Sequence, residues 1–136
     1  MHEERGVKPV TEVCKRLKVP TQMKQLAITV CKEHLKCHQA LTLKPGTLWR
    51  LLQRLDVLRR PERVEAFVQA CECDSRGRLG LEDREYPQSA YILKVMDVVR
   101  NIKAQDLPAD IKGPDIGEML IERRIHAIGE LKAQYS

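Results

Sequence analysis

Apolar residues recur at steps of three and four along nearly the whole chain, and this spacing limits the fold more than any other feature of the sequence. It is typical of helices that bury one face, whereas strands alternate with a period of two. No segment alternates over the length of a strand. Prolines stand where helices are expected to begin: Pro20, Pro45, Pro61, Pro87 and Pro114. The sequence therefore predicts an all-α fold of about six main helices, packed as an irregular bundle without a sheet.

The ends of these helices are predicted from turn-forming residues. The first helix is expected to stop before Pro20, because a residue that precedes proline avoids the helical conformation. Thr21 is expected to cap the second helix. The fourth helix is expected to begin at Pro61 and to end near Gly77, which can adopt the left-handed conformation. The segment 76–86 has two glycines, several charges and no apolar stripe, so it is predicted to be the longest loop.

Composition narrows the class of protein. The chain has 136 residues, of which 43% are hydrophobic, and this is enough for a core. It contains no run of about 18 apolar residues, so no membrane partner is expected. Its five cysteines are an odd number and no signal peptide accompanies them, which predicts reduced, mostly buried thiols and a cytoplasmic location. With 4% aromatic residues, an aromatic platform for stacking bases is not expected.

The formal charge of +5 is unevenly distributed, since residues 85–136 alone carry a net charge of −1. Between residues 44 and 84, eight of the nine cations are Arg, whose planar group grips phosphate through two hydrogen bonds. One interpretation of this segment is an ordinary solvated helix surface. The other is a face that follows a phosphate backbone.

The residues that carry candidate chemistry are few. His34 and His38 are four residues apart and would share one helix face, the spacing at which two side chains bind one metal. Two histidines at this spacing are also common on ordinary helix surfaces. Asp74 precedes two arginines, where a carboxylate either forms a salt bridge at a helix end or ligates a metal. Taken alone, the sequence contains no phosphate-binding glycine loop and no complete active site.

Several segments resemble bacterial CCA-adding enzymes. The most specific is residues 60–88, which contains RPERVEAFVQACECDSRGR and GLEDREYPQ. Residues 111–125, which begin IKGPDIGE, resemble the tail of the same enzymes. His2 and His34 resemble positions in the second half of their HD-type phosphohydrolase domain. The similarity covers nearly the whole chain in the expected order.

The resemblance implies a part of a larger enzyme. CCA-adding enzymes are tRNA nucleotidyltransferases, which use CTP, ATP and Mg²⁺ to add C, C and A to the 3′ end of tRNA without a template. In proteobacterial members an HD domain hydrolyses phosphate esters with a divalent metal, for which a transition metal is one candidate. The chain has neither the catalytic head nor a His-Asp doublet. It is therefore expected to be a C-terminal part without catalytic residues, with residues 1–80 ending the HD and body region and residues 81–136 forming the tail.

The resemblance also implies roles for single residues. The chain is expected to hold the acceptor and T-arm backbone of tRNA for the head, through phosphate and not through bases. The expected phosphate contacts are Arg59, Arg60, Arg63, Arg76, Arg78, Lys112, Arg123 and Arg124. The expected remnants of the HD metal site are His2, His34 and Asp74. So few ligands are expected to bind no metal tightly.

Two other functions stay open from the sequence. One is a stand-alone helical adaptor that binds protein or RNA, and the other is a residual metal-dependent phosphohydrolase. A chain separated from a longer protein would also bare apolar surface, which a dimer would cover.

Overall fold

The structure, a computed structural model, describes residues 2–77, 80 and 83–135, with the backbone alone for residues 2–5. The described residues form six α-helices and two short 3-10 helices without a strand, which confirms the predicted all-α class. The elements are α1 (His2–Arg16), α2 (Thr21–His38), η1 (Ala40–Thr42), α3 (Pro45–Arg54), α4 (Pro61–Arg76), α5 (Pro87–Asn101), η2 (Ala104–Asp106) and α6 (Gly113–Gln134). None of these helices is both long and apolar enough to cross a membrane.

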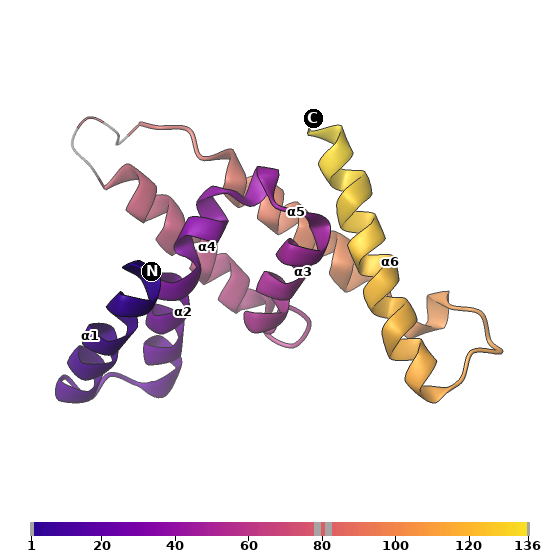
Figure 1. The fold of residues 1–136 in the computed structure, drawn as a ribbon, viewed down its shortest axis with the longest axis horizontal. Coiled ribbons are helices and arrows are strands. Elements are labelled where there is room, and N and C mark those ends of the chain that lie inside the picture. The colour runs from indigo at the N-terminus through magenta and orange to yellow at the C-terminus, as the bar shows by residue number, and fades with distance from the viewer. Residues whose placement is uncertain (1, 78–79, 81–82, 136) are drawn as a thin grey trace.

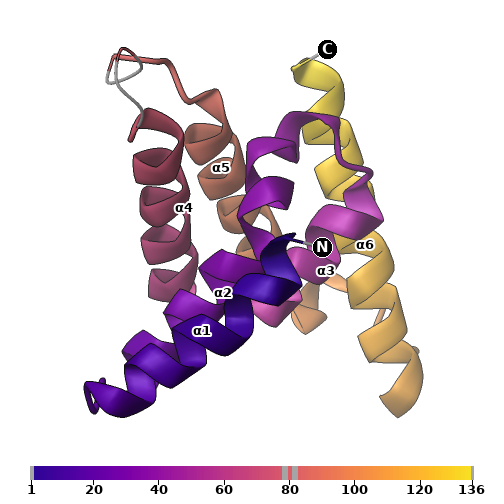
Figure 2. The same cartoon turned by 60° about the vertical axis from the view of Figure 1, so that its left-hand side comes forward.

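The helices form an elongated bundle. α1 and α2 make a hairpin at one end, and α6 lies at the other end (Figure 1). Between them, α2 packs on α4 and α4 packs on α5, while α6 packs on α3 and α5 (Figure 2). The helices α2 and α4, which carry the candidate site, therefore lie in the middle of the packing.

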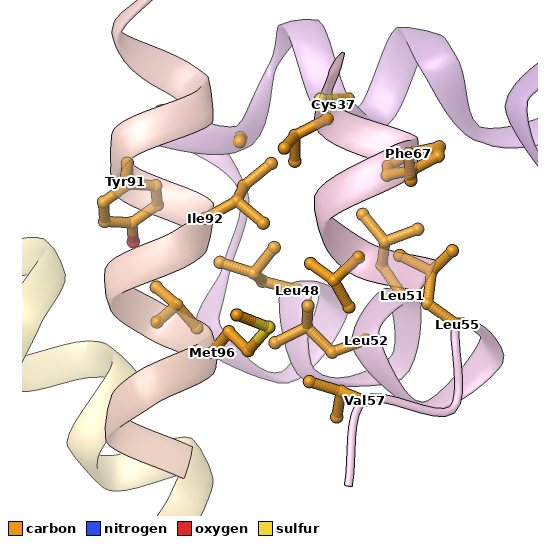
Figure 3. Close-up of a cluster of buried hydrophobic side chains, with 14 of the residues drawn as sticks. Cys37, Leu48, Leu51, Leu52, Leu55, Val57, Phe67, Tyr91, Ile92 and Met96 are labelled. Atoms are coloured by element: carbon orange, nitrogen blue, oxygen red, sulfur yellow. The ribbon is translucent and has the colours of Figure 1, made fainter. Parts of the chain in front are cut away.

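The core forms where α3 fills the space beside α4 and α5. Leu48, Leu51 and Leu52 of α3 are fully buried, and the last two lie three and four residues after Leu48, on the same helix face. Figure 3 shows them in one cluster with Phe67 of α4 and Ile92 of α5. Burying each such side chain stabilises the fold by about 1.5–3 kcal/mol, so the cluster holds α4 and α5 firmly in place.

The fourth helix ends at Arg76, next to Gly77 as predicted, but the predicted roles of Thr21 and Gly77 at their helix ends are wrong. Thr21 is the first residue of α2, and the capping position belongs to Pro20, which makes no side-chain hydrogen bond there. Gly77 keeps a right-handed conformation, with φ −73°, because its N–H still donates to the carbonyl of Asp74 at 3.4 Å. The left-handed residues other than glycine are Lys18, with φ 52°, and Asp56, with φ 57°, and each follows a helix.

Lys18 closes the turn between α1 and α2. The N–H of Val19 donates to the carbonyl of Cys14 at 3.0 Å, and that of Lys18 donates to the carbonyl of Lys15 at 3.3 Å. This pair of bonds is the Schellman motif, in which glycine is the usual left-handed residue. A lysine there carries a Cβ that crowds the following carbonyl oxygen, so the turn is strained.

Arg124 of α6 ties three helices together, and it is only 9% exposed. Its Nε donates to the carbonyl of Val99 at 3.2 Å and its Nη2 donates to the carbonyl of Ile102 at 3.0 Å. These carbonyls lie at the end of α5, where a helix leaves its last acceptors without internal partners. The guanidinium carbon also lies 5.6 Å from the centre of the Trp49 ring on α3. Burial lowers the pKa of Arg124, yet an arginine stays charged at neutral pH.

Replacing Lys18 with glycine is expected to raise the free energy of unfolding by about 1 kcal/mol, because glycine adopts the left-handed conformation without strain. The matched control is Lys15→Gly, the same exchange inside α1, which should lower that free energy by about 1 kcal/mol. Urea unfolding followed by circular dichroism measures both. Two substitutions with the same sign would contradict the assignment.

Replacing Arg124 with methionine is expected to lower the free energy of unfolding by about 2–3 kcal/mol, because two carbonyls at the end of α5 lose a charged donor. The neighbouring exposed Arg123 supplies the control, since Arg123→Met should change that free energy by less than about 0.5 kcal/mol. Thermal and urea unfolding of the two variants test this. Equal losses would mean that Arg124 does not hold α5.

Candidate functional site

Two hollows lie along the contact between α2 and α4. The histidine pocket, of about 400 Å³, is lined by His34, Leu35, His38, Asp74, Ser75, Arg84, Glu85, Tyr86, Pro87 and Gln88. The arginine pocket, of about 330 Å³, is lined by Gln22, Met23, Gln25, Leu26, Arg60, Glu62, Arg63 and Ala66. The first lies where both helices end and the second where both begin, so α2 and α4 run side by side in one direction. At a helical rise of about 1.5 Å per residue, Arg63 and Asp74 are about 16 Å apart along α4.

His34 lines the histidine pocket, and backbone carbonyls of α2 hold one of its ring nitrogens. Its Nδ1 lies 3.0 Å from the carbonyl of Val30 and 3.1 Å from that of Cys31. Carbonyl oxygens accept and never donate, so Nδ1 carries the proton. In the neutral ring Nε2 is then left as an acceptor or a metal ligand, as in histidines whose second nitrogen is fixed by a carbonyl.

His38 joins α2 to two other parts of the chain. Its Nε2 lies 3.0 Å from Oδ2 of Asp74 on α4, and its Nδ1 lies 2.7 Å from the hydroxyl of Tyr86. The side-chain amide of Gln88, at the start of α5, donates to the backbone carbonyl of His38 at 2.8 Å. The predicted shared face of the two histidines is confirmed, since the ring centres of His34 and His38 are 5.8 Å apart.

The polar contacts continue from His38 into the core. The hydroxyl of Tyr86 also lies 3.2 Å from Sγ of Cys37, so its single proton serves His38 or Cys37. Hydrogen bonds from Cys71 and then from Tyr86 lower the pKa of Cys37, although burial opposes them. The hydrogen bond to Cys37 and burial raise the pKa of Cys71 far above the usual thiol range. Burial, followed by the bond to Cys37, raises the pKa of Tyr86, so its phenol stays neutral.

The predicted metal ligands are only partly brought together. His34 and Asp74 line the same pocket, whereas the side chain of His2 lies outside the described residues. Oδ2 of Asp74 is already bonded to His38. In the part of the chain that the structure describes, no three His, Cys, Asp or Glu side chains are grouped so as to hold a metal. A divalent metal bound by His34 and Asp74 would therefore need further ligands from elsewhere.

The arginine pocket contains two of the predicted phosphate contacts. Arg60 stands directly before α4 and Arg63 lies in its first turn. No hydrogen bond or ion pair joins either guanidinium to another described side chain. Arg59 is close by in sequence, 77% exposed, with its Nε 3.4 Å from a carboxylate oxygen of Asp56. Within the lining, Glu62 supplies the one carboxylate, and the first turn of α2 has no acidic residue.

Another predicted phosphate contact, Arg76, lies at the end of α4. The Nε of Arg76 donates to the carbonyl of Arg84 at 2.7 Å, and its Nη1 lies 3.2 Å from Oε2 of Glu72. Arg76 thus holds the chain that returns toward α5, and these bonds occupy part of its guanidinium. Arg78 lies outside the described residues.

The remaining three candidates lie on or near α6. Lys112 lines a hollow with four carboxylates, those of Asp110, Asp115, Glu118 and Glu122. Arg123 is exposed, with a long hydrogen bond of 3.4 Å to the carbonyl of Asp106. Arg124 is buried and committed to backbone carbonyls, so we withdraw it as a phosphate contact. Charge alone could not separate Arg124 from Arg123 in the sequence.

Sequence reasoning missed Tyr86 and Gln88 of the histidine pocket. They contact His38 from 48 and 50 residues away, and no local spacing reveals such a contact. The only sequence signal was Pro87 at the start of a helix, which brings its neighbours to a helix end. The side-chain oxygen of Gln88 is buried in the pocket wall without a hydrogen-bond partner among the described residues.

Comparison with known proteins identifies relatives over nearly the full chain. It is 73% identical over 135 residues to the multifunctional CCA protein of Acinetobacter baumannii and 75% identical to that of Acinetobacter baylyi, in both cases across 99% of this chain. It is 48% identical over 129 residues to that of Stenotrophomonas maltophilia, across 94% of this chain. The chain spans 32–33% of the length of these curated relatives. No family model matches the chain, and no solved structure matches it. The predicted resemblance is confirmed: over nearly its whole length the chain matches about a third of these multifunctional CCA proteins.

Proposed function

We propose that this chain holds tRNA for the catalytic part of a CCA-adding enzyme. The observation that carries the proposal is its 73–75% identity, over 99% of its length, to multifunctional CCA proteins. The activity of such a protein needs a nucleotidyltransferase head with Mg²⁺, CTP and ATP. In this part of the enzyme we assign no residue that touches the reacting phosphates.

Of the candidate phosphate contacts, we favour the three arginines at the start of α4. Arg59 is highly exposed, and Arg60 and Arg63 have no ion pair among the described residues, so their guanidinium groups are available to a ligand. In contrast, Arg76 is tied to the backbone and Arg124 is buried. Because A-form RNA hides its base edges in a deep groove, phosphate contacts suit an enzyme that holds many tRNAs by shape.

Replacing Arg60 and Arg63 together with alanine is expected to weaken binding of a tRNA transcript that lacks its CCA end. The plot of log affinity against log salt should become shallower by about 1.4–1.8, because each lost phosphate contact releases roughly 0.7–0.9 fewer counterions. Filter binding between about 50 and 200 mM salt covers the useful range.

The control for this experiment removes the same charge elsewhere. An Arg100→Ala and Lys103→Ala double variant loses two exposed cations at and after the end of α5, where no phosphate contact is proposed. Its salt dependence should stay close to that of the unaltered chain. If both double variants flatten the plot equally, the binding depends on net charge and the assignment to α4 is wrong.

A second candidate function is metal-dependent hydrolysis of a phosphate ester in the histidine pocket. The observation that favours it is the fixed proton on Nδ1 of His34, which leaves Nε2 free to ligate a metal in the pocket that Asp74 also lines. His34 and Asp74 would hold the metal, which would polarise a phosphate ester or activate water there. The further ligands would come from the missing part of the enzyme.

The chain alone, supplied with Mg²⁺ or Ni²⁺, is expected to show no turnover of a 2′,3′-cyclic nucleoside phosphate, because two protein ligands hold a metal weakly. The assay measures product by chromatography at several metal concentrations. Turnover that disappears in His34→Ala but persists in His126→Ala, which alters an exposed histidine of α6, would show that the chain already contains the active site.

A further inference from the structure

The lining of the arginine pocket combines two kinds of side chain. Arg60, Glu62 and Arg63 on α4 and Gln22 and Gln25 on α2 are charged or polar, whereas Met23, Leu26 and Ala66 are apolar. Residues three apart on one helix share a face, so Met23 with Leu26, and Gln22 with Gln25, form two adjacent rows of α2. A purely ionic contact with an RNA backbone would not need the apolar side chains.

Met23 is largely exposed, whereas methionine is usually a buried residue. Its side chain is 62% exposed, in contrast to Leu26, which is partly buried against the core. Methionine is flexible and polarisable, and it adapts to flat or irregular ligands. Together with a guanidinium plane, it offers a base an apolar surface on which to stack without an aromatic side chain.

The charges in the pocket are also unbalanced. Arg60 and Arg63 lie at the start of α4, where the helix itself is partially positive and cations are unfavourable. The carboxylate of Glu62 forms no ion pair with either of them among the described contacts. An anionic group in the pocket would relieve the repulsion between the two guanidinium groups and would be held by both.

We propose that the arginine pocket binds one unpaired nucleotide of RNA, with its phosphate on Arg60 and Arg63 and its base on Met23 and Leu26. The volume of about 330 Å³ lies within the range of small-ligand pockets. The amides of Gln22 and Gln25 can donate to or accept from the edge of the base. This assignment rests on the proposed tRNA function for the identity of the RNA, and it adds that part of the RNA is single-stranded where it meets α2 and α4.

The test uses the full chain and small probes, so that it does not depend on tRNA binding. Cytidine 5′-monophosphate, adenosine 5′-monophosphate and inorganic phosphate are titrated separately, and amide shifts of α2 and α4 are followed by NMR. The mononucleotides should bind at least about fivefold more tightly than phosphate, which is the lower end of what stacking of one base contributes. Their shifts should centre on residues 22–26 and 60–66.

Three single variants distinguish the contribution of the arginines from that of the apolar side chains. Arg63→Gln should weaken binding of all three probes, whereas Met23→Ser should weaken only the mononucleotides. Arg100→Gln removes an exposed cation from α5 and should change none of them. Because Arg63, Met23 and Arg100 are outside the buried core, the folded state of each variant can be checked by its amide spectrum.

The outcomes also separate this proposal from the tRNA function. Equal affinity for phosphate and mononucleotides, or shifts that centre elsewhere, would overturn the nucleotide pocket even if tRNA binding responds to Arg60 and Arg63. Mononucleotide binding that Met23→Ser weakens would support the pocket even if tRNA binding does not respond. No detectable binding of either mononucleotide at concentrations up to about 10 mM, well above the affinity expected for a ligand of that size, would overturn it as well.

Discussion

Because α2 and α4 bury their faces against each other and run in the same direction, they bring like ends of two helices together. The buried side of α4 includes Phe67 and Cys71, and the end of α2 contributes Cys37 to the same core cluster. A helix is partially positive at its start and partially negative at its end. The packing of this one pair of helices therefore creates two electrostatically different pockets, one with arginines where the helices begin and one with histidines where they end.

The buried charged side chains of this chain have polar partners, in contrast to Arg60 and Arg63. The carboxylate of Glu33 is only 7% exposed, and Arg54 on α3 donates to both of its oxygens, at 2.9 and 3.2 Å. Arg124 is similarly satisfied by two carbonyls. An unpaired charge is tolerated in water and becomes costly as it is buried. Among the described residues, the half-exposed guanidinium groups of Arg60 and Arg63 have no ion-pair partner, at a position that the helix makes unfavourable for cations, and a bound anion would remove that cost.

Local and long-range features differ in how well the sequence reveals them. The helices follow from apolar spacing and from Pro45, Pro61 and Pro87, because both act within one or two turns of the chain. The left-handed conformation of Lys18 was not predictable, since tertiary packing sets the direction of the chain there and overrides the preference for glycine. The contact of His38 with Tyr86 spans 48 residues and depends on how three helices meet. The spacing of apolar residues within each helix does not indicate how the three helices pack together.

The surface between the two pockets affects the direction that an RNA strand bound at the arginine pocket would take. On α4, Phe67 and Ala70 lie between Arg63 and Asp74 at steps of three and four residues, so they share the same side of the helix. Neither carries a charge, so a phosphate backbone that followed this side of α4 would meet no cation before the carboxylate of Asp74. An RNA strand held at Arg63 would instead leave on the side of Arg59, the exposed cation next to the pocket. The two pockets are thus better suited to separate ligands than to successive phosphates of one strand.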